Sequence, residues 1–272
     1  TVTTLPNFFN ASRERYTSQL VGTKIYIPQN NGTGLEIIDT TNNTVTTYAN
    51  FFNASKGRYA SQLVGTKIYI PQHGSRGLDI IDTTNDKITT YANFFNASRS
   101  RYTSHLVGTK IYIPQGSGTA LEIIDTTNNT VTTLVNFFNA NRYRLTSQLV
   151  DDKIYIPEYR GTALEIIDTT NNTVTTLPNF FNASREKETS QLVGTKIYIP
   201  QNNGTALEII DTTTNTVTTL TNFSSRERYT SQLVGTKIYI PEHIGTALEI
   251  IDTINLIAQA LPVRNNTETQ RR

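Results

Sequence analysis

The chain has 272 residues, of which 24 are basic and 22 are acidic, and its formal net charge is +2. This near balance gives no global attraction to nucleic acid, and no apolar run approaches the roughly 18 residues of a membrane span. Cysteine is absent, which excludes disulfides, thiolate metal sites and cysteine nucleophiles. Methionine is absent too, so the chain shows no initiator residue and we expect a processed or excised product.

Residues 17–48 alternate short β-prone runs with turn residues. Pro28 ends the second run because proline cannot donate to a strand ladder, and the loop rich in Asn and Gly that follows it is typical of a turn. The runs contain many β-branched residues, and none shows helical periodicity. We predict four strands, at residues 17–21, 24–27, 35–39 and 44–48.

The same pattern recurs along the chain in six near-copies. The motif Lys-Ile-Tyr-Ile-Pro begins at Lys24, Lys67, Lys110, Lys153, Lys196 and Lys237, with four spacings of 43 residues and a last spacing of 41. A repeat of this length indicates a solenoid, a propeller or an array. The period therefore has to be interpreted before any local motif.

Four short strands per copy are what a β-propeller blade requires. Ile37 and Ile38 point to opposite faces of one strand, as expected when a blade lies between two neighbours. The Phe8-Phe9 pair recurs in the connections between copies, and we interpret it as a plug between blades rather than an exposed aromatic site. A parallel β-helix is the competing fold, but its coils are usually shorter. We predict an all-β, six-bladed propeller of four-stranded antiparallel blades over residues 1–262, followed by a polar tail at 263–272.

Two segments compete to complete the sixth blade. Residues 1–5 (Thr-Val-Thr-Thr-Leu) match the fourth strand of a copy, and residues 256–261 occupy the same place in the repeat. Because the Val-Thr-Thr pattern is degraded at 256–261, we favour closure by the N-terminal strand.

The stretch from Lys24-Ile-Tyr-Ile to Leu35-Glu-Ile-Ile-Asp-Thr-Thr-Asn-Asn-Thr-Val45 resembles the YVTN type of propeller repeat, and Gly34 to Asp39 is similar to the related LVIVD repeat. The likeness covers about half of each copy. It implies a secreted or surface-exposed prokaryotic propeller that binds or scaffolds, and it supplies no catalytic motif. Seven blades are more usual in that type than six, which leaves both closure and oligomer formation open.

Two stretches vary among the copies: residues 12–16 with their equivalents, and the loop that begins at Gln29 with its equivalents. In a propeller meander both emerge on the same rim, and loops on a rigid scaffold commonly carry binding groups. Guanidinium groups interleaved with tyrosine suit carboxylate, sulfate or phosphate groups, and sugar planes can stack on the rings. The alternative is a solvated charged face that drifted after duplication. The candidate rim residues are Arg13, Arg15, Tyr16, Arg58, Tyr59, Arg101, Tyr102, Arg142, Arg144, Arg185, Arg228 and Tyr229.

One position of the innermost strand is polar in every copy. Facing the axis, it would line a central channel, although we favour the interpretation that these groups satisfy one another and the backbone. The residues are Gln19, Gln62, His105, Gln148, Gln191 and Gln232. Asp39 and its equivalents precede turns such as Thr-Thr-Asn, and we interpret them as turn caps rather than acids or bases. His73 and His243 fall in blades that are not adjacent, so we expect no shared metal.

No nucleophile elbow, phosphate-binding glycine loop or zinc spacing is present, and six nearly equal blades lack the asymmetry of a catalytic site. We therefore predict no enzyme and no cofactor. The predicted function is recognition of glycans or anionic ligands by the variable rim, where six weak sites would add avidity. The alternative is a structural or protein-interaction scaffold, such as a surface-layer protein or a recently amplified or engineered repeat protein. The partner is thus a glycan or a protein, and an extracellular or cell-surface location is favoured.

Overall fold

A computed structural model describes residues 5, 8–9, 13–221, 223, 227–242 and 248–255. The chain forms two compact units, Thr1–Asn179 and Phe180–Arg272. The first unit contains the first four copies of the repeat and the second unit contains the last two. Each copy forms one antiparallel sheet, here called blade 1 to blade 6 in chain order.

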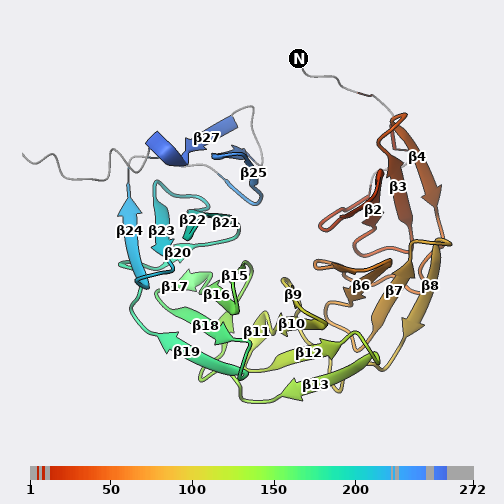
Figure 1. The fold of residues 1–272 in the computed structure, drawn as a ribbon, viewed down its shortest axis with the longest axis horizontal. Coiled ribbons are helices and arrows are strands. Elements are labelled where there is room, and N and C mark those ends of the chain that lie inside the picture. Colours follow the sequence, from red (N-terminus) through yellow and green to blue (C-terminus); the bar gives the residue numbers. More distant parts are fainter. Residues whose placement is uncertain are drawn as a thin grey trace, which may run out of the picture. The chain divides into compact units, whose positions relative to one another are not determined.

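In the first unit the four blades have the same strand order, and their outermost strands follow one another along one side (Figure 1). Blade 1 consists of β1 (Gln19–Val21), β2 (Lys24–Pro28), β3 (Leu35–Asp39) and β4 (Thr44–Tyr48). Blade 2 consists of β5 (Gln62–Val64), β6 (Lys67–Pro71), β7 (Leu78–Asp82) and β8 (Lys87–Tyr91). Blade 3 consists of β9 (His105–Val107), β10 (Lys110–Pro114), β12 (Leu121–Asp125) and β13 (Thr130–Leu134). Blade 4 consists of β15 (Gln148–Val150), β16 (Lys153–Pro157), β18 (Leu164–Asp168) and β19 (Thr173–Leu177).

Short strands lie in the loops of the first unit: β11 (Ser117–Gly118), β14 (Arg142–Tyr143) and β17 (Arg160–Gly161). The second unit begins with β20 (Arg185–Glu186). Blade 5 consists of β21 (Gln191–Val193), β22 (Lys196–Pro200), β23 (Leu207–Asp211) and β24 (Thr216–Leu220), and blade 6 of β25 (Gln232–Val234), β26 (Lys237–Pro241) and β27 (Leu248–Asp252).

The register within a blade is identical from copy to copy. Lys24 pairs with Asp39 and Pro28 with Leu35 across β2 and β3, and the equivalent residues pair in every other blade. Gly22 takes a positive φ of 59° in the hairpin turn that joins β1 to β2, a conformation that glycine adopts without steric cost. Asp39 accepts hydrogen bonds from the backbone and hydroxyl of Thr41, so its interpretation as a turn cap is confirmed.

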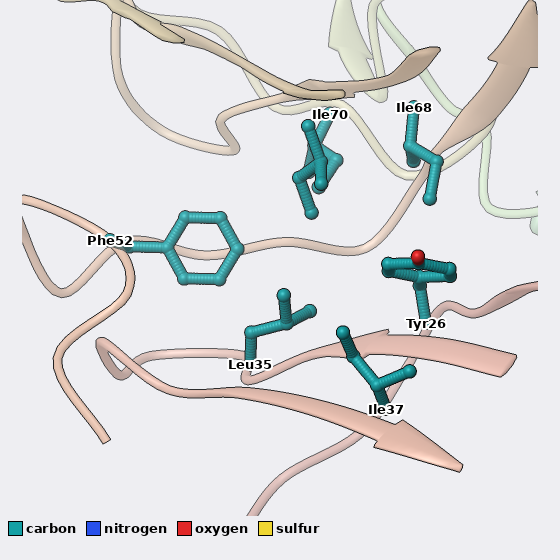
Figure 2. Packing of buried hydrophobic residues seen from close by; sticks show 7 residues of the cluster. Tyr26, Leu35, Ile37, Phe52, Ile68 and Ile70 are labelled. Atoms are coloured by element: carbon teal, nitrogen blue, oxygen red, sulfur yellow. The ribbon is translucent and has the colours of Figure 1, made fainter. Parts of the chain in front are cut away.

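The core lies between consecutive blades. Tyr26 and Leu35 of blade 1 face Ile70 of blade 2, and Phe52 from the connecting segment fills the space beside them (Figure 2). The remaining members of this cluster are Ile37, Ile68 and Ile81. The same arrangement joins blades 2 and 3, blades 3 and 4, and, in the second unit, blades 5 and 6. At about 25 cal/mol per Å² of buried apolar surface, these interfaces are the main source of stability.

Each blade thus has two apolar faces because strand side chains alternate. The sequence predicts that the Phe-Phe pair is an inter-blade plug; its second member is buried in the cluster, as Phe52, Phe95 and Phe138 show, and its first member packs against it partly buried. The predicted all-β fold of six antiparallel blades, that of a β-propeller, is confirmed. Blade 6 has three strands within the described part of the chain. Residues 1–4, the segment 256–261 and the tail 263–272 lie outside the described residues. Across the described residues, none of the helical segments could cross a membrane.

Candidate functional site

The two variable stretches are joined to each other by backbone hydrogen bonds. His73 in the loop after β6 donates to Gly57 O of its own blade at 2.8 Å, and Gly74 donates to Arg99 O of the next blade at 2.9 Å. Asn31 of the preceding loop donates to Lys56 O at 3.0 Å. In blades 2 to 4 the segment equivalent to residues 12–16 therefore lies between two loops, so the two variable stretches lie side by side within the first unit.

The second basic residue of each segment points inward from this rim. The Arg58 side chain is fully buried, and its Nε and Nη2 each lie 3.1 Å from Asp79 Oδ2 in β7. Nη1 donates to Gly32 O at 2.7 Å and to Gln29 O at 3.2 Å, both in the loop of blade 1. The guanidinium also lies 3.7 Å from the centroid of the Phe52 ring. We call this arrangement the arginine clasp.

The clasp recurs with the same partners in the other copies of the first unit. Arg101 donates from Nε and Nη2 to Glu122 at 2.6 and 2.9 Å, and from Nη1 to Ser75 O at 2.6 Å. Arg144 binds Glu165 in the same way at 2.5 and 2.8 Å. The equivalent pairs are Arg15 with Glu36 in blade 1 and Arg228 with Glu249 in blade 6. A guanidinium has enough donors to satisfy a carboxylate and several carbonyls at once, which a buried charge requires.

The clasp corrects the sequence-based placement of Arg58, Arg101, Arg144 and Arg228 on a ligand-binding rim. Their side chains are buried and their donors are committed to carboxylates and carbonyls, because burial of a cation is tolerated only when it is paired. Arg15 is partly exposed but makes the same bidentate contact with Glu36. The four buried arginines also bind loop carbonyls of the preceding blade, so they join blades and are not available to a ligand.

The first arginine of the segment lies closer to the surface. In four copies its side chain is 12–19% exposed, and its Nε lies 3.5–3.8 Å from the carboxylate of the clasp. These residues are Arg13, Arg99, Arg142 and Arg185. In these copies the strand carboxylate thus faces two cations, which leaves little free positive charge on the rim. Arg13 also donates from Nη1 to Gln29 Oε1 at 2.7 Å.

Tyrosine rings dominate what the rim of the first unit exposes. The ring of Tyr16 lies 4.9 Å from that of Tyr59, which lies 5.3 Å from that of Tyr102. His73 fits between the last two, at 4.7 Å from Tyr59 and 4.5 Å from Tyr102. Tyr16 is 59% exposed, whereas the other three rings are partly buried. These four residues form the tyrosine cluster.

Glycines make room for this cluster. A Cβ on Gly116 would lie 2.4 Å from Cδ2 of Tyr102, and one on Gly57 would lie 3.2 Å from Cε2 of Tyr59. The rings therefore rest directly on backbone. Such close support fixes their orientation and reduces the conformational entropy that a ligand contact would otherwise cost.

Burial disfavours the charged form of three members of the tyrosine cluster. Burial lowers the pKa of His73, whose Nδ1 accepts a hydrogen bond from the backbone N–H of Arg101 at 3.1 Å. Burial raises the pKa of Tyr102, and burial and nearby Glu14 raise that of Tyr16. An array of neutral rings favours apolar or polarised C–H faces over free anions.

Not every copy contributes a ring. Tyr143 is exposed two positions before the equivalent position in blade 4, and Tyr229 is exposed in the second unit. The fourth and fifth copies carry Leu145 and Glu188 at the cluster position. The cluster is therefore a feature of blades 1 to 3, not of the repeat as such.

Four of the six predicted channel residues contact the following blade. Gln19 donates to Ser61 O and Oγ at 3.0 Å, and Gln62 donates to Ser104 O at 2.8 Å. His105 Nε2 lies 2.7 Å from Ser147 Oγ. In the second unit Gln191 donates to Ser231 O at 2.8 Å, whereas Gln232 is exposed. Gln148 occupies the equivalent position in β15. For Gln19, Gln62 and Gln191 the favoured interpretation, satisfaction by neighbouring groups, fits these contacts.

Two sets of residues at the candidate site were not predicted from the sequence. The strand carboxylates, from Glu36 to Glu249, could have been noticed because an acid recurs at a position that should be buried. His73 joins the tyrosine cluster only through the fold, and no sequence signal predicts it. Within the described parts of the chain, no three His, Asp or Glu side chains converge as metal ligands would.

Six antiparallel blades of one repeated design define the class of protein as a β-propeller. No protein-family model matches the chain, and no curated protein matches it, so the YVTN and LVIVD likeness stays a prediction. Among solved structures, the chain is similar to virginiamycin B lyase from Staphylococcus aureus, with a TM-score of 0.71 and 13% identity over 87% of this chain and 83% of that one.

Two other solved structures show the same fold. Kuenenia stuttgartiensis hydrazine synthase matches with a TM-score of 0.68 and 14% identity, covering 88% of this chain and 76% of that chain. BamB from Moraxella catarrhalis matches with a TM-score of 0.58 and 13% identity, covering 83% and 66%. At such low identity the similarity shows the propeller fold alone, and it is compatible with binding or scaffold roles.

Proposed function

We propose that the protein is a non-enzymatic recognition module whose tyrosine cluster binds glycans. The observation that supports this is the continuous contact of Tyr16, Tyr59, His73 and Tyr102 on the exposed rim. Tyrosine offers a flat apolar face with a polar tip, which suits a sugar ring with its C–H face and hydroxyl groups. Because most of the rim arginines are paired with carboxylates, we propose that the cluster binds the planes of sugar rings rather than anionic groups.

A binding role also agrees with the chemistry of the described residues. Asp39 and its equivalents cap turns, and the strand carboxylates are paired with arginine or lysine, so neither set is poised as an acid or base. His105 is held neutral by burial and hydrogen-bonded to Ser147. Catalysis would need groups whose pKa values are separated at a common site.

Binding of the intact protein to a glycan array, followed by titration of the strongest hits, tests the proposal. Tyr59→Ala should weaken binding at least about tenfold, since it removes the central ring of the cluster. Tyr48→Ala, which removes an exposed ring from β4, is the matched control and should leave binding unchanged. Absence of binding to every glycan, or equal losses in the two variants, would overturn the proposal.

A second candidate function is a protein-interaction scaffold, and blade 6 supplies its supporting observation. Leu248 is 56% exposed in β27, whereas its equivalent Leu207 in blade 5 is fully buried against blade 6. Exposed apolar side chains of this kind commonly mark interaction surfaces. Light scattering over a concentration series should show self-association that Leu248→Thr reduces, and a strictly monomeric protein would argue against this role.

A further inference from the structure

We propose a second binding site, at the outer edge between blades 2 and 3, for a saccharide that bears a carboxylate. Two shallow hollows meet there, with volumes of about 400 and 460 Å³, and they share Asn93, Phe94 and Val131. Together they form one groove, the outer groove, whose volume lies in the range of small-molecule sites. The groove has no residue in common with the tyrosine cluster, and the proposal does not depend on the function proposed above.

Arg76 makes this groove unlike its counterparts in the other copies. The equivalent residue is threonine in all five other copies: Thr33, Thr119, Thr162, Thr205 and Thr246. In three of them the hydroxyl donates toward the asparagine equivalent to Asn93, at 3.4–3.5 Å. Copy 2 has replaced this local hydrogen bond with a long cationic side chain.

The Arg76 guanidinium is held in place by one nitrogen and has further hydrogen-bond donors that are not used within the described part of the chain. Its Nε donates to Phe95 O at 2.9 Å, and the Phe95 N–H donates back to Arg76 O at 2.9 Å. Its Nη1 and Nη2 atoms make no hydrogen bond or ion pair with any residue that the structure describes. This arginine therefore differs from the clasp arginines, all of which bind a carboxylate. Two parallel N–H donors held in this way match a ligand carboxylate.

Two side-chain amides beside Arg76 also have unused hydrogen-bonding groups. Asn93 and Asn96 line the groove and form no hydrogen bond with the described part of the chain. In the next copy the equivalent Asn139 accepts a hydrogen bond from Thr176 at 3.4 Å. A carboxamide offers both donors and an acceptor, which is the combination that sugar hydroxyls require.

The remainder of the groove provides an apolar floor. Tyr91 and Phe94 have ring centroids 5.8 Å apart, and Val131 lines both hollows. None of the lining side chains is acidic, so Arg76 gives the groove a net positive charge. A cation, free amides and aromatic rings along an open groove together fit an acidic sugar unit within an oligosaccharide, rather than a free inorganic anion.

The test is titration of the whole protein with an oligogalacturonate and, in parallel, with the neutral galactose oligomer of equal length. The acidic oligomer should bind and the neutral one should bind at least about tenfold more weakly, because it lacks the charged hydrogen bonds to Arg76. Arg76→Thr installs the residue of the other five copies, so it should fold normally and lose the preference for the acidic oligomer. Arg76→Lys keeps the charge but lacks the two parallel donors, so this variant should lose most of the preference for the acidic oligomer.

Lys87→Thr is the matched control. It removes one positive charge from the same blade, outside the groove lining, and it restores the threonine found at the equivalent positions of blades 1, 3, 4 and 5. Lys87→Thr should bind the acidic oligomer as tightly as the unaltered protein does. Equal losses in Lys87→Thr and Arg76→Thr, or equal affinity for the two oligomers, would overturn the proposal. Tyr59→Ala should leave this binding intact, which separates it from recognition by the tyrosine cluster.

Discussion

Arg101 holds Glu122 in a bidentate contact at 2.6 and 2.9 Å, with both side chains buried. The same guanidinium donates to Ser75 O and Gln72 O in the loop of the preceding blade. One side chain therefore fixes a strand of its own blade and a loop of its neighbour. Because it neutralises a buried carboxylate as it does so, this contact is structural, although it lies beneath the candidate ligand face.

Replacing Arg101 should be strongly destabilising. Arg101→Ala leaves Glu122 buried without its main counter-charge, and we expect a loss of about 3–5 kcal/mol in the free energy of unfolding. Arg99→Ala, which removes the more exposed second cation, should cost about 1 kcal/mol or less. Urea unfolding of both variants measures the difference. Similar losses in the two variants would show that the clasp is not the dominant contact.

The fifth copy carries the weakest clasp, and arginine should improve it. Lys187 Nζ lies 3.7 Å from Glu208 Oε2, and Glu208 Oε1 accepts no hydrogen bond from any described residue. Burial raises the pKa of Glu208, and the nearby charges of Lys187 and Arg185 offset this effect only in part. Lys187→Arg should stabilise the protein by about 1 kcal/mol because the guanidinium can reach both oxygens.

Thermal or urea unfolding of Lys187→Arg would test this. The reverse change in the fourth copy, Arg144→Lys, is the matched control and should destabilise. A stabilising Arg144→Lys would contradict the explanation.

His105 should make the protein sensitive to acid. Burial lowers its pKa in the folded state from 6.5 to about 4, so folding favours the neutral ring. The stability is therefore complete above about pH 6.5 and falls as the pH drops towards 4, by at most about 3 kcal/mol. His105→Gln, which installs the residue of the other five copies, should remove this part of the loss. Urea unfolding at pH 7 and at several pH values between 6.5 and 4 gives the slope of the free energy of unfolding against pH for both proteins. Identical slopes would show that His105 is not the source of the acid sensitivity.

The hairpin turn of the fourth copy is strained relative to the others. Asp151 has a positive φ of 51°, where Gly22, Gly65, Gly108, Gly194 and Gly235 have φ values of 59–61°. A Cβ at those glycines would meet no atom within 4 Å, so the cost is conformational rather than steric crowding. Asp151→Gly should stabilise by about 0.5–1 kcal/mol. Gly108→Asp should show a loss of similar size, and thermal melts of both variants would measure these changes.

The candidate site was only partly predictable. Sequence variation predicted a common rim, and within the first unit the segments and loops that vary are joined by hydrogen bonds such as His73 N–H to Gly57 O. It could not distinguish Arg101, which is buried, from Arg99, which is partly exposed, because the two arginines lie two residues apart in the same polar stretch. Strand alternation places residues i and i+2 on the same face, so it gives no reason to expect different burial for the two members of such a pair.

The fold itself follows from local chemistry repeated six times. Turn glycines, β-branched runs and a constant spacing specify antiparallel blades with two apolar faces, because each of these signals depends on residues close together in the chain. What only the tertiary structure decided is which polar groups are neutralised. The Arg58 and Asp79 side chains are 21 residues apart, and the partner carbonyls of Arg58 belong to another blade. Whether a charge is available to a ligand depends on such distant neighbours, so the exposed tyrosines and Arg76 can be recognised as candidate binding groups only once the blades are packed.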